Sequence, residues 1–403
     1  MSPEIALVNH KPLNPPDGGT IRIEGILRGL RRNHNVTFAH WEAESQGYDP
    51  LNALTSAKPK LRLIRKVANH LYGSEDGGAA LDLILCNYPS LFAKARSQVG
   101  SSSVLQAEQI WSAFLPLLYR KALNKVSVLD DHNVETSLAR RLAPYASNPR
   151  VYENWVRYVS ILEGISCRLA DAVVVTSEQD KRDLQRVHNV SQKKIRVIPN
   201  GTDIDKYRPD SRLRYETRLK LGIGETTPVL TYVGRFGYPP NELAIRYIKD
   251  KLAPSVWEKH PDSVFFIVSR DLPNHFVQEL DPRIVQISGD SDYPYINSSD
   301  ICLAPIVVGG GTRIKIANYL ACGKAVVSTP VGCEGIPVTN NKEVAISGFE
   351  DFPRRVCDLI ESKTAREELG RNGRSFAERY CSWERSVSAF EELFESLHSS
   401  NGN

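Results

Sequence analysis

The chain has 403 residues, 41% of them hydrophobic and 24% charged, and its formal net charge at pH 7 is +4. This length suggests two domains, each large enough for its own core, and the composition is ordinary for a soluble globular protein. So small a net charge does not by itself argue for nucleic acid, and no nucleic-acid partner is predicted.

Seven cysteines are scattered along the chain without a CxxC pair. We therefore expect reduced, mostly buried thiols rather than disulfides or a metal site. The N-terminus, MSPEIALVNHK, lacks a basic start followed by a long apolar run. No stretch reaches the roughly 18 apolar residues of a membrane span. A cytoplasmic protein without a classical export signal is predicted.

The N-terminal half alternates apolar strands with helical segments. Strands are predicted at residues 5–8, 36–39, 81–86, 104–107, 126–129, 172–176 and 195–198, and helices around residues 23–30, 154–169 and 178–187. This alternation predicts a parallel, doubly wound sheet. Because ligands bind outside the carboxyl ends of such strands, Gly18 and Gly19, which follow the first strand, are candidates to line a crevice.

The segment Lys58–Leu71 (KPKLRLIRKVANHL) lies within the irregular residues 42–80 and mixes Lys and Arg with Leu, Ile and Val. This is the composition of a basic amphipathic helix. Such a helix either lies on an anionic membrane surface or, more often, packs with a solvated charged face. Peripheral contact of this segment with the inner face of the membrane is therefore one hypothesis, and a packed helix with a solvated charged face is the alternative.

The pattern restarts after the polar residues 202–227, which look like a domain boundary. Strands are predicted at residues 229–233, 264–268 and 284–287, and helices at residues 241–252, 352–362, 364–380 and 383–397. Arg235 and Arg270 each follow the end of a predicted strand. Two successive halves of this kind predict two Rossmann-like domains facing across a cleft.

The most informative stretch is 305–336, PIVVGGGTRIKIANYLACGKAVVSTPVGCEGI. An apolar strand ends at Gly309, Gly310 and Gly311, and a helix is expected to open at Thr312. Glycines let the backbone approach a ligand closely, and the first amides of a helix are unpaired donors, so the turn suits a phosphate. Arg313 and Lys315 add positive charge there, and Asn318 shares a helix edge with Lys315. Glycine turns before helices are common in α/β proteins, so this stretch alone does not decide whether the turn binds phosphate.

Five ordered segments carry a family resemblance: ADAVVVTSEQDKRDL, IRVIPNGTDIDKYRP, TYVGRFGYPPNELAIRYI, GGGTRIKIANYLACGKAVVSTPVGCEGI and NGRSFAERYCSWE. From about residue 161 onward, and more loosely from residue 1, the chain resembles the retaining GT-B glycosyltransferases of family 4, the glycosyl transferases group 1, in their GGGTR subgroup. The resemblance implies an acceptor-binding domain over residues 1–205, a nucleotide-sugar-binding domain over 206–383 and, over 384–403, a helix packing back on the first domain.

The resemblance also implies the activity. Such enzymes transfer a hexose from a nucleotide-diphosphate sugar to a hydroxyl of a glycan or lipid-linked acceptor, in cell-surface polysaccharide or glycoconjugate biosynthesis. They need neither a metal ion nor a cofactor, so none is expected here. The donor is a substrate.

Site residues follow by position in the matching motifs. The resemblance places the donor diphosphate at Gly309–Lys315 and puts Arg235 on its phosphates, with a surface ion pair as the alternative for this arginine. It places His132 near the transferred sugar, and Gly18 and Gly19 near the diphosphate and acceptor. Arg270 joins the donor-binding set. A lone histidine is more often structural, but its position just beyond a strand favours substrate positioning.

Two residues depart from the family pattern. Asn318 stands where a glutamate usually binds the ribose, and Pro240 stands where a lysine is usual. An amide can still bind hydroxyls, without the stronger charge-assisted bond. These changes leave open a non-catalytic nucleotide-sugar-binding subunit of a glycosyltransferase complex. A GT-B nucleotide-sugar epimerase is a further alternative, against which the group 1 segments weigh.

Overall fold

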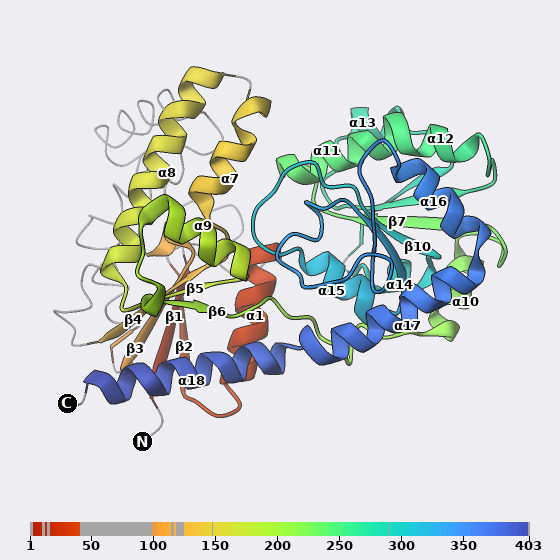
Figure 1. Ribbon diagram of the computed structural model, residues 1–403. Coiled ribbons are helices and arrows are strands. Elements are labelled where there is room, and N and C mark those ends of the chain that lie inside the picture. Colours follow the sequence, from red (N-terminus) through yellow and green to blue (C-terminus); the bar gives the residue numbers. More distant parts are fainter. Residues whose placement is uncertain are drawn as a thin grey trace. The chain divides into compact units, whose positions relative to one another are not determined.

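The computed structural model describes residues 3–9, 13, 17–40, 99–100, 102–113, 117, 125–146, 148–289 and 291–401. The chain forms two compact units. The first unit comprises Met1–Pro199 and Ser386–Asn403, and the second comprises Asn200–Arg385. Each unit is built on a parallel sheet flanked by helices (Figure 1). The strand predicted at residues 81–86 and the segment Lys58–Leu71 lie outside the described residues.

The first unit holds a six-stranded sheet in the order β2-β1-β3-β4-β5-β6, with every neighbouring pair parallel. Its strands are β1 (Ile5–Asn9), β2 (Val36–His40), β3 (Val104–Glu108), β4 (Val126–Asp131), β5 (Ala172–Val175) and β6 (Ile195–Val197). Its helices are α1 (Gly18–Leu30), α7 (Glu135–Leu142), α8 (Pro149–Leu169) and α9 (Glu178–His188), together with most of α18 (Trp383–Asn401).

Local chemistry explains how α1 begins and packs. Asp17 caps the helix, because its Oδ1 accepts from the Thr20 amide at 2.9 Å while the Thr20 hydroxyl accepts from the Asp17 amide at 2.7 Å. Such a capping box satisfies two amides that the helix leaves unpaired. At the other end, a Cβ on Gly29 would collide with Val387 of α18. The glycine therefore lets the C-terminal helix lie close against α1.

The second unit holds a six-stranded sheet in the order β12-β11-β10-β7-β8-β9, also parallel. Its strands are β7 (Val229–Val233), β8 (Val264–Val268), β9 (Ile284–Ile287), β10 (Ile301–Ala304), β11 (Ala325–Ser328) and β12 (Ala345–Ile346). Its helices are α10 (Ser211–Lys220), α11 (Pro239–Tyr247), α12 (Ala253–Trp257), α13 (Asn274–Gln278), α14 (Tyr293–Ser298), α15 (Ile314–Ala321), α16 (Phe352–Glu361) and α17 (Lys363–Tyr380), and a π-helical turn (Ile248–Leu252) joins α11 to α12.

The second unit begins at Asn200, just before the polar residues 202–227, which include α10 with its buried Arg218 donating to Asp300 at 2.8 Å. Two local expectations differ from the structure. The helix after the glycines begins at Ile314 rather than Thr312, because Arg313 has extended backbone and acts as its N-cap residue. Strand β4 continues through Asp131 instead of ending at residue 129.

In each sheet the chain order reverses at one pair of neighbouring strands. Among the described strands, β2 extends the first sheet beyond β1 while β4 to β6 extend it beyond β3. Strands β8 and β9 likewise extend the second sheet beyond β7, while β11 and β12 extend it beyond β10. Open parallel sheets bind ligands outside the strand carboxyl ends at such a reversal. The topology thus predicts ligand sites at the carboxyl ends of the β1–β3 pair and of the β7–β10 pair.

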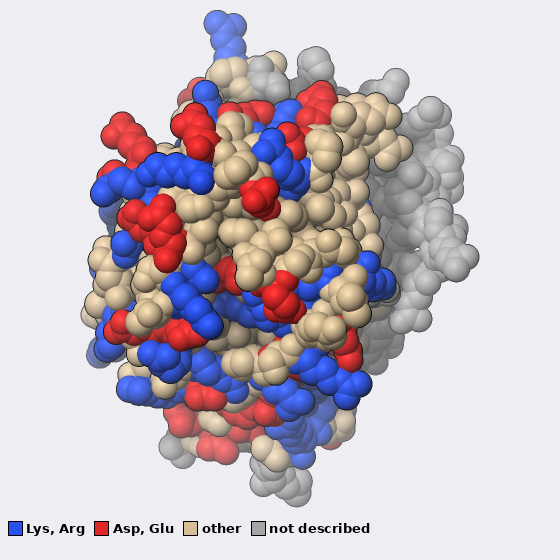
Figure 2. Space-filling view, turned by 90° about the vertical axis from the view of Figure 1, so that its right-hand side faces the viewer, with Lys and Arg blue, Asp and Glu red and all other residues tan. Residues whose placement is uncertain are grey.

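The surface and the cysteines add little functional signal. Figure 2 shows Lys and Arg side chains interspersed with Asp and Glu over one face, without an extended area of one sign. The cysteines of the described segments, residues 167, 302, 322, 333, 357 and 381, are free and buried, as expected. No helix among the described residues is both long and apolar enough to span a bilayer.

Candidate functional site

The glycine loop of the second unit lies at the β7–β10 reversal and folds around Arg313. Gly311 has a φ of +59°, a conformation that favours glycine. The Arg313 guanidinium donates to the Gly311 carbonyl, and it lies so close to Gly309 that a Cβ there would collide with it. The missing side chains therefore make room for the guanidinium beside the loop, just before the first turn of α15.

Lys315 brings a second positive charge to this place. Its Nζ donates to the Tyr232 hydroxyl and to Asn241 Oδ1, each at 2.9 Å, and lies 4.2 Å from the centre of the Tyr232 ring. Tyr232 belongs to β7 and Asn241 to α11, so Lys315 connects both sides of the reversal. Burial of the ammonium, reinforced by the charge of Arg313, lowers the pKa of Lys315 to about 7. It therefore titrates near neutral pH.

The other predicted donor residues have partners of their own. Arg235, just beyond β7, pairs with Asp271 at 2.8 Å, and its side chain is 57% exposed. Arg270 donates to the Gly289 carbonyl at 3.3 Å from an exposed position beyond β8. Thr312 accepts from the Asn200 amide at 2.9 Å. Gly310 sits half-buried in the same loop. The structure thus gathers Gly309, Gly311, Arg313 and Lys315, and it leaves Arg235 and Arg270 nearer solvent.

Asn318 is buried on the far part of α15. Its Oδ1 accepts from the Thr202 hydroxyl at 2.7 Å, and its side chain also hydrogen-bonds Asp292. Asp292 therefore provides, within hydrogen-bonding distance of Asn318, the carboxylate that position 318 itself lacks. The Asp292 carboxyl accepts from the Tyr207 hydroxyl at 2.7 Å.

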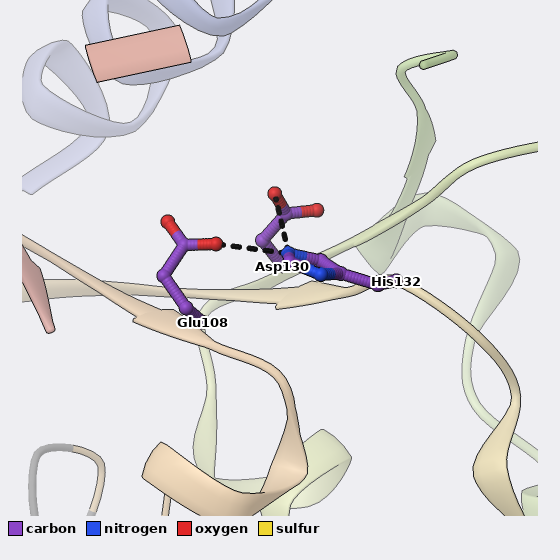
Figure 3. A group of neighbouring side chains, drawn as sticks. All are labelled: Glu108, Asp130 and His132. Carbon is purple, nitrogen blue, oxygen red and sulfur yellow. Dashed lines mark hydrogen bonds and ion pairs between the residues drawn. The ribbon is translucent and has the colours of Figure 1, made fainter. Parts of the chain in front are cut away.

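In the first unit, His132 lies in a buried polar group beside the β1–β3 reversal. Its Nε2 is 3.0 Å from Glu108 Oε2 and 3.5 Å from Asp130 Oδ2 (Figure 3). Its Nδ1 is 3.0 Å from the side-chain nitrogen of Gln109. Asp130 in turn receives two hydrogen bonds from Arg22, at 2.8 and 2.9 Å. Both ring nitrogens of His132 are therefore engaged by protein groups.

The charges in this group balance in pairs. Burial opposes charge on the imidazole, but the nearby Asp130 and Glu108 outweigh it and raise the pKa of His132 to about 9. Burial also opposes ionisation of Asp130, yet Arg22 and His132 lower its pKa to about 2. For Glu108 burial prevails, so its pKa is raised. An imidazolium and a guanidinium thus face two carboxyl groups. Because the imidazolium has N–H at both nitrogens, its Nδ1 donates, and the Gln109 amide meets it through the amide oxygen, with the N and O ends of the amide exchanged.

Gly19 is brought to His132, whereas Gly18 stands apart. A Cβ on Gly19 would lie 2.6 Å from the Gln109 side-chain nitrogen and 3.3 Å from His132 Nδ1. A Cβ on Gly18 would meet no described atom within 4 Å. The start of α1 therefore needs glycine at position 19, so that Gln109 and His132 can lie against it.

Sequence reasoning missed Arg22, Glu108, Gln109 and Asp130. Their signal was weak but present, since Glu108 ends β3 and Asp130 lies near the end of β4, where crevice residues collect. Asp131 is on the opposite face of β4, where burial and the neighbouring carboxylates of Glu163 and Glu135 raise its pKa. The polar run around His132 is thus divided between two faces of the sheet.

Glu108, Asp130 and His132 could in principle hold a metal ion, because one ligand atom from each lies within 4.8 Å of the others. However, both Asp130 oxygens already accept from Arg22. The buried guanidinium thus supplies the positive charge that a metal would bring. A site without a resident metal stays a prediction.

Each unit matches a glycosyltransferase family model. Residues 16–206 match the family model described as Glycosyltransferase Family 4, and residues 227–362 match the model described as Glycosyl transferases group 1. The two matches follow one another along the chain. The first begins after β1 and includes β3, and the second includes both β7 and β10.

Two curated relatives are similar over part of the chain. The chain is 24% identical over 249 residues to the D-inositol 3-phosphate glycosyltransferase of Corynebacterium jeikeium, covering 57% of this chain and 58% of that protein. It is 28% identical over 156 residues to the UDP-Gal:alpha-D-GlcNAc-diphosphoundecaprenol alpha-1,3-galactosyltransferase of Escherichia coli, covering 36% of this chain and 39% of that protein. The chain thus spans less than two thirds of either relative.

Among solved structures, the fold resembles Anabaena HepE in complex with UDP-glucose, with a TM-score of 0.69 and 13% sequence identity. The match covers 98% of this chain and 100% of that one, and at this identity it concerns the fold alone. The predicted fold class is confirmed, with two parallel doubly wound sheets. The chain thus has the GT-B fold, and its two halves match, one after the other, the models of Glycosyltransferase Family 4 and Glycosyl transferases group 1.

Proposed function

We propose that the chain is a retaining, metal-independent glycosyltransferase of the GGGTR subgroup. In this proposal it transfers a hexose from a nucleotide-diphosphate sugar to a hydroxyl of a glycan or lipid-linked acceptor, in polysaccharide or glycoconjugate biosynthesis. The observation that carries the proposal is that two cations lie at the strand-order reversal of the second sheet: Arg313 against the loop Gly309–Gly311, and Lys315 nearby on α15. Such reversals bind ligands in open parallel sheets.

The chemistry of the loop fits a departing nucleoside diphosphate. Negative charge grows on the leaving phosphate in the transition state, and fixed cations and amides lower the barrier because they need not reorganise. Arg313 can make paired hydrogen bonds to phosphate oxygens, and Lys315 supplies a compact charge. We propose that the second unit binds the donor and the first the acceptor. Attack from the face of the departing phosphate would then retain the anomeric configuration.

The names of the relatives support this substrate class. One curated relative is a UDP-galactose-dependent transferase acting on a diphosphoundecaprenol-linked sugar, and the Anabaena protein was solved with UDP-glucose. A cytoplasmic location with peripheral membrane contact through Lys58–Leu71 would suit a lipid-linked acceptor. That segment lies outside the described residues, so the contact stays a prediction.

A panel of nucleotide sugars tests the proposal. We expect at least one to raise the melting temperature of the purified chain and to be hydrolysed slowly, and lipid-linked saccharides to accept its sugar with the anomeric configuration retained. Chelator should leave the rate unchanged. Binding without hydrolysis or transfer would favour the non-catalytic subunit, for which Asn318 in place of glutamate is the motivating observation. Conversion of the sugar while it stays on the nucleotide would indicate an epimerase.

Donor affinity should depend on pH through Lys315. Because the pKa of Lys315 is about 7 in the structure and a bound diphosphate would raise it, binding should take up a proton above that pH. Affinity should then fall by up to about tenfold per pH unit as the pH rises above about 7. Calorimetry in two buffers of different ionisation enthalpy measures the uptake. Lys315→Met should bind more weakly and remove this slope, and an equal slope in both proteins would contradict the role of Lys315.

A further inference from the structure

Gln109 has a backbone conformation that is essentially reserved for glycine. Its φ is 62° and its ψ is 163°. A residue with a side chain is strained in such a region and persists there only when its surroundings impose it. The residue follows β3 directly, at the strand-order reversal of the first sheet, where a ligand crevice is expected.

The surroundings of Gln109 explain how the conformation is held. Its amide donates to the Asp130 carbonyl at 2.8 Å, which extends the pairing of β3 and β4 by one residue. The next residue, Ile110, is fully buried and begins a turn of 3-10 helix. On the other side, the side chain reaches His132 Nδ1 at 3.0 Å, through space that Gly19 leaves open. The strain therefore places one particular amide group against the histidine.

Gln109 is also the exposed end of a buried polar chain. Glu108, Asp130 and His132 are buried, whereas Gln109 is half-buried. Both ring nitrogens of His132 already have protein partners, at 3.0 Å each. A glutamine amide offers two donors and two acceptor positions, and the contact with His132 uses one of them. The group of this chain best placed to meet a ligand at the reversal is thus the Gln109 amide.

We propose that Gln109 is a substrate-contacting residue whose amide, seated against His132, hydrogen-bonds a hydroxyl of a sugar substrate. This rests on the proposed function. The hydroxyl belongs either to the sugar of the donor or to the acceptor, and the chemistry of recognition is the same. The strained backbone is retained because a residue with a relaxed backbone at this position would direct its side chain elsewhere.

Comparing Gln109→Gly with Gln109→Ala separates the effect of losing the side-chain amide from the effect of the strained backbone. The glycine variant removes the amide and relieves the strain, so its melting temperature should not fall, while its kcat/KM should drop roughly tenfold for the loss of one hydrogen bond. The alanine variant removes the amide and keeps the strain, so it should melt below the glycine variant with the same kinetic loss. As a matched control, Asn189→Gly changes another residue of positive φ in the first unit and should leave kcat/KM unchanged.

Binding measurements identify the sugar that is contacted. The probes are the nucleotide sugar selected by the panel and its nucleoside diphosphate. Weaker binding of the nucleotide sugar to Gln109→Gly, with unchanged binding of the diphosphate, assigns the contact to the donor. Unchanged binding of both, with a raised KM for the acceptor, assigns it to the acceptor. Wild-type kcat/KM in Gln109→Gly overturns the proposal alone, whereas a wild-type chain that binds no nucleotide sugar overturns the proposed function and this contact with it.

Discussion

Arg313→Ala should lower turnover of the nucleotide sugar by about 100- to 1,000-fold, the loss typical of removing one fixed donor to a developing negative charge. The guanidinium lies against the Gly309–Gly311 loop, where its hydrogen bond to Gly311 orients it before any substrate arrives. Alanine would remove the charge and leave the loop open to water. The loss should fall mainly on kcat, since the charge on the leaving group is largest in the transition state.

Initial rates of donor hydrolysis and transfer measure this effect. Arg354→Ala is the matched control, because Arg354 is also in the second unit but is exposed and pairs with Asp351 at 2.9 Å. Arg235→Ala should also cut turnover if this arginine leaves Asp271 to meet the phosphates. Unchanged rates in both Arg313→Ala and Arg235→Ala would contradict the proposed donor site.

Arg22→Ala should destabilise the first unit by about 3–5 kcal/mol, because it leaves the buried Asp130 carboxylate without its main partner. The Arg22 and Asp130 side chains are each 1% exposed. Arg22 also donates to the carbonyls of Ile198 and Pro199, at 3.1 and 3.2 Å, so four hydrogen bonds are lost together. Since Asp130 faces His132 as well, the imidazole should lose its orientation.

Urea unfolding followed by circular dichroism measures the change in free energy of unfolding. The double variant Arg22→Met with Asp130→Asn is the informative control, because it removes both charges and should be less destabilised than the sum of the single changes. Strictly additive losses, or a loss below about 1 kcal/mol for Arg22→Ala, would mean that the Arg22–Asp130 pair contributes no more to stability than a surface ion pair.

The periodic parts of the fold were predictable from the sequence. The apolar run at residues 229–233 and the first half of the run at residues 301–308 are buried parallel strands, because strands covered on both faces are continuously apolar. The glycine turn before α15 was recognisable because glycine next to a basic helix start is a local pattern, and its binding of phosphate stays a prediction. The helix start itself was misplaced by two residues, because the extended backbone of Arg313 depends on its contacts with the loop.

The partners of the site residues were not predictable in this way. Arg22 of α1 reaches Asp130 across 108 residues of sequence, and Glu108 meets His132 because β3 and β4 are neighbours in the sheet. Arg235 was expected on the phosphates and pairs in the structure with Asp271. The positive φ of Gln109 has no signal in the sequence, since glutamine rarely adopts it and the conformation is imposed by tertiary contacts.

By itself, the sequence determined the two α/β halves, the resemblance to the family and the glycine loop. These depend on residue type and short spacing, which local sterics and burial translate directly into strands, turns and helices. Only the tertiary structure decided that Lys315 lies against Tyr232 and Asn241, and that Gln109 is the accessible end of the His132 group. Such contacts depend on strand order and on burial, because a charge acquires its partner and its pKa from residues that the sheet brings beside it.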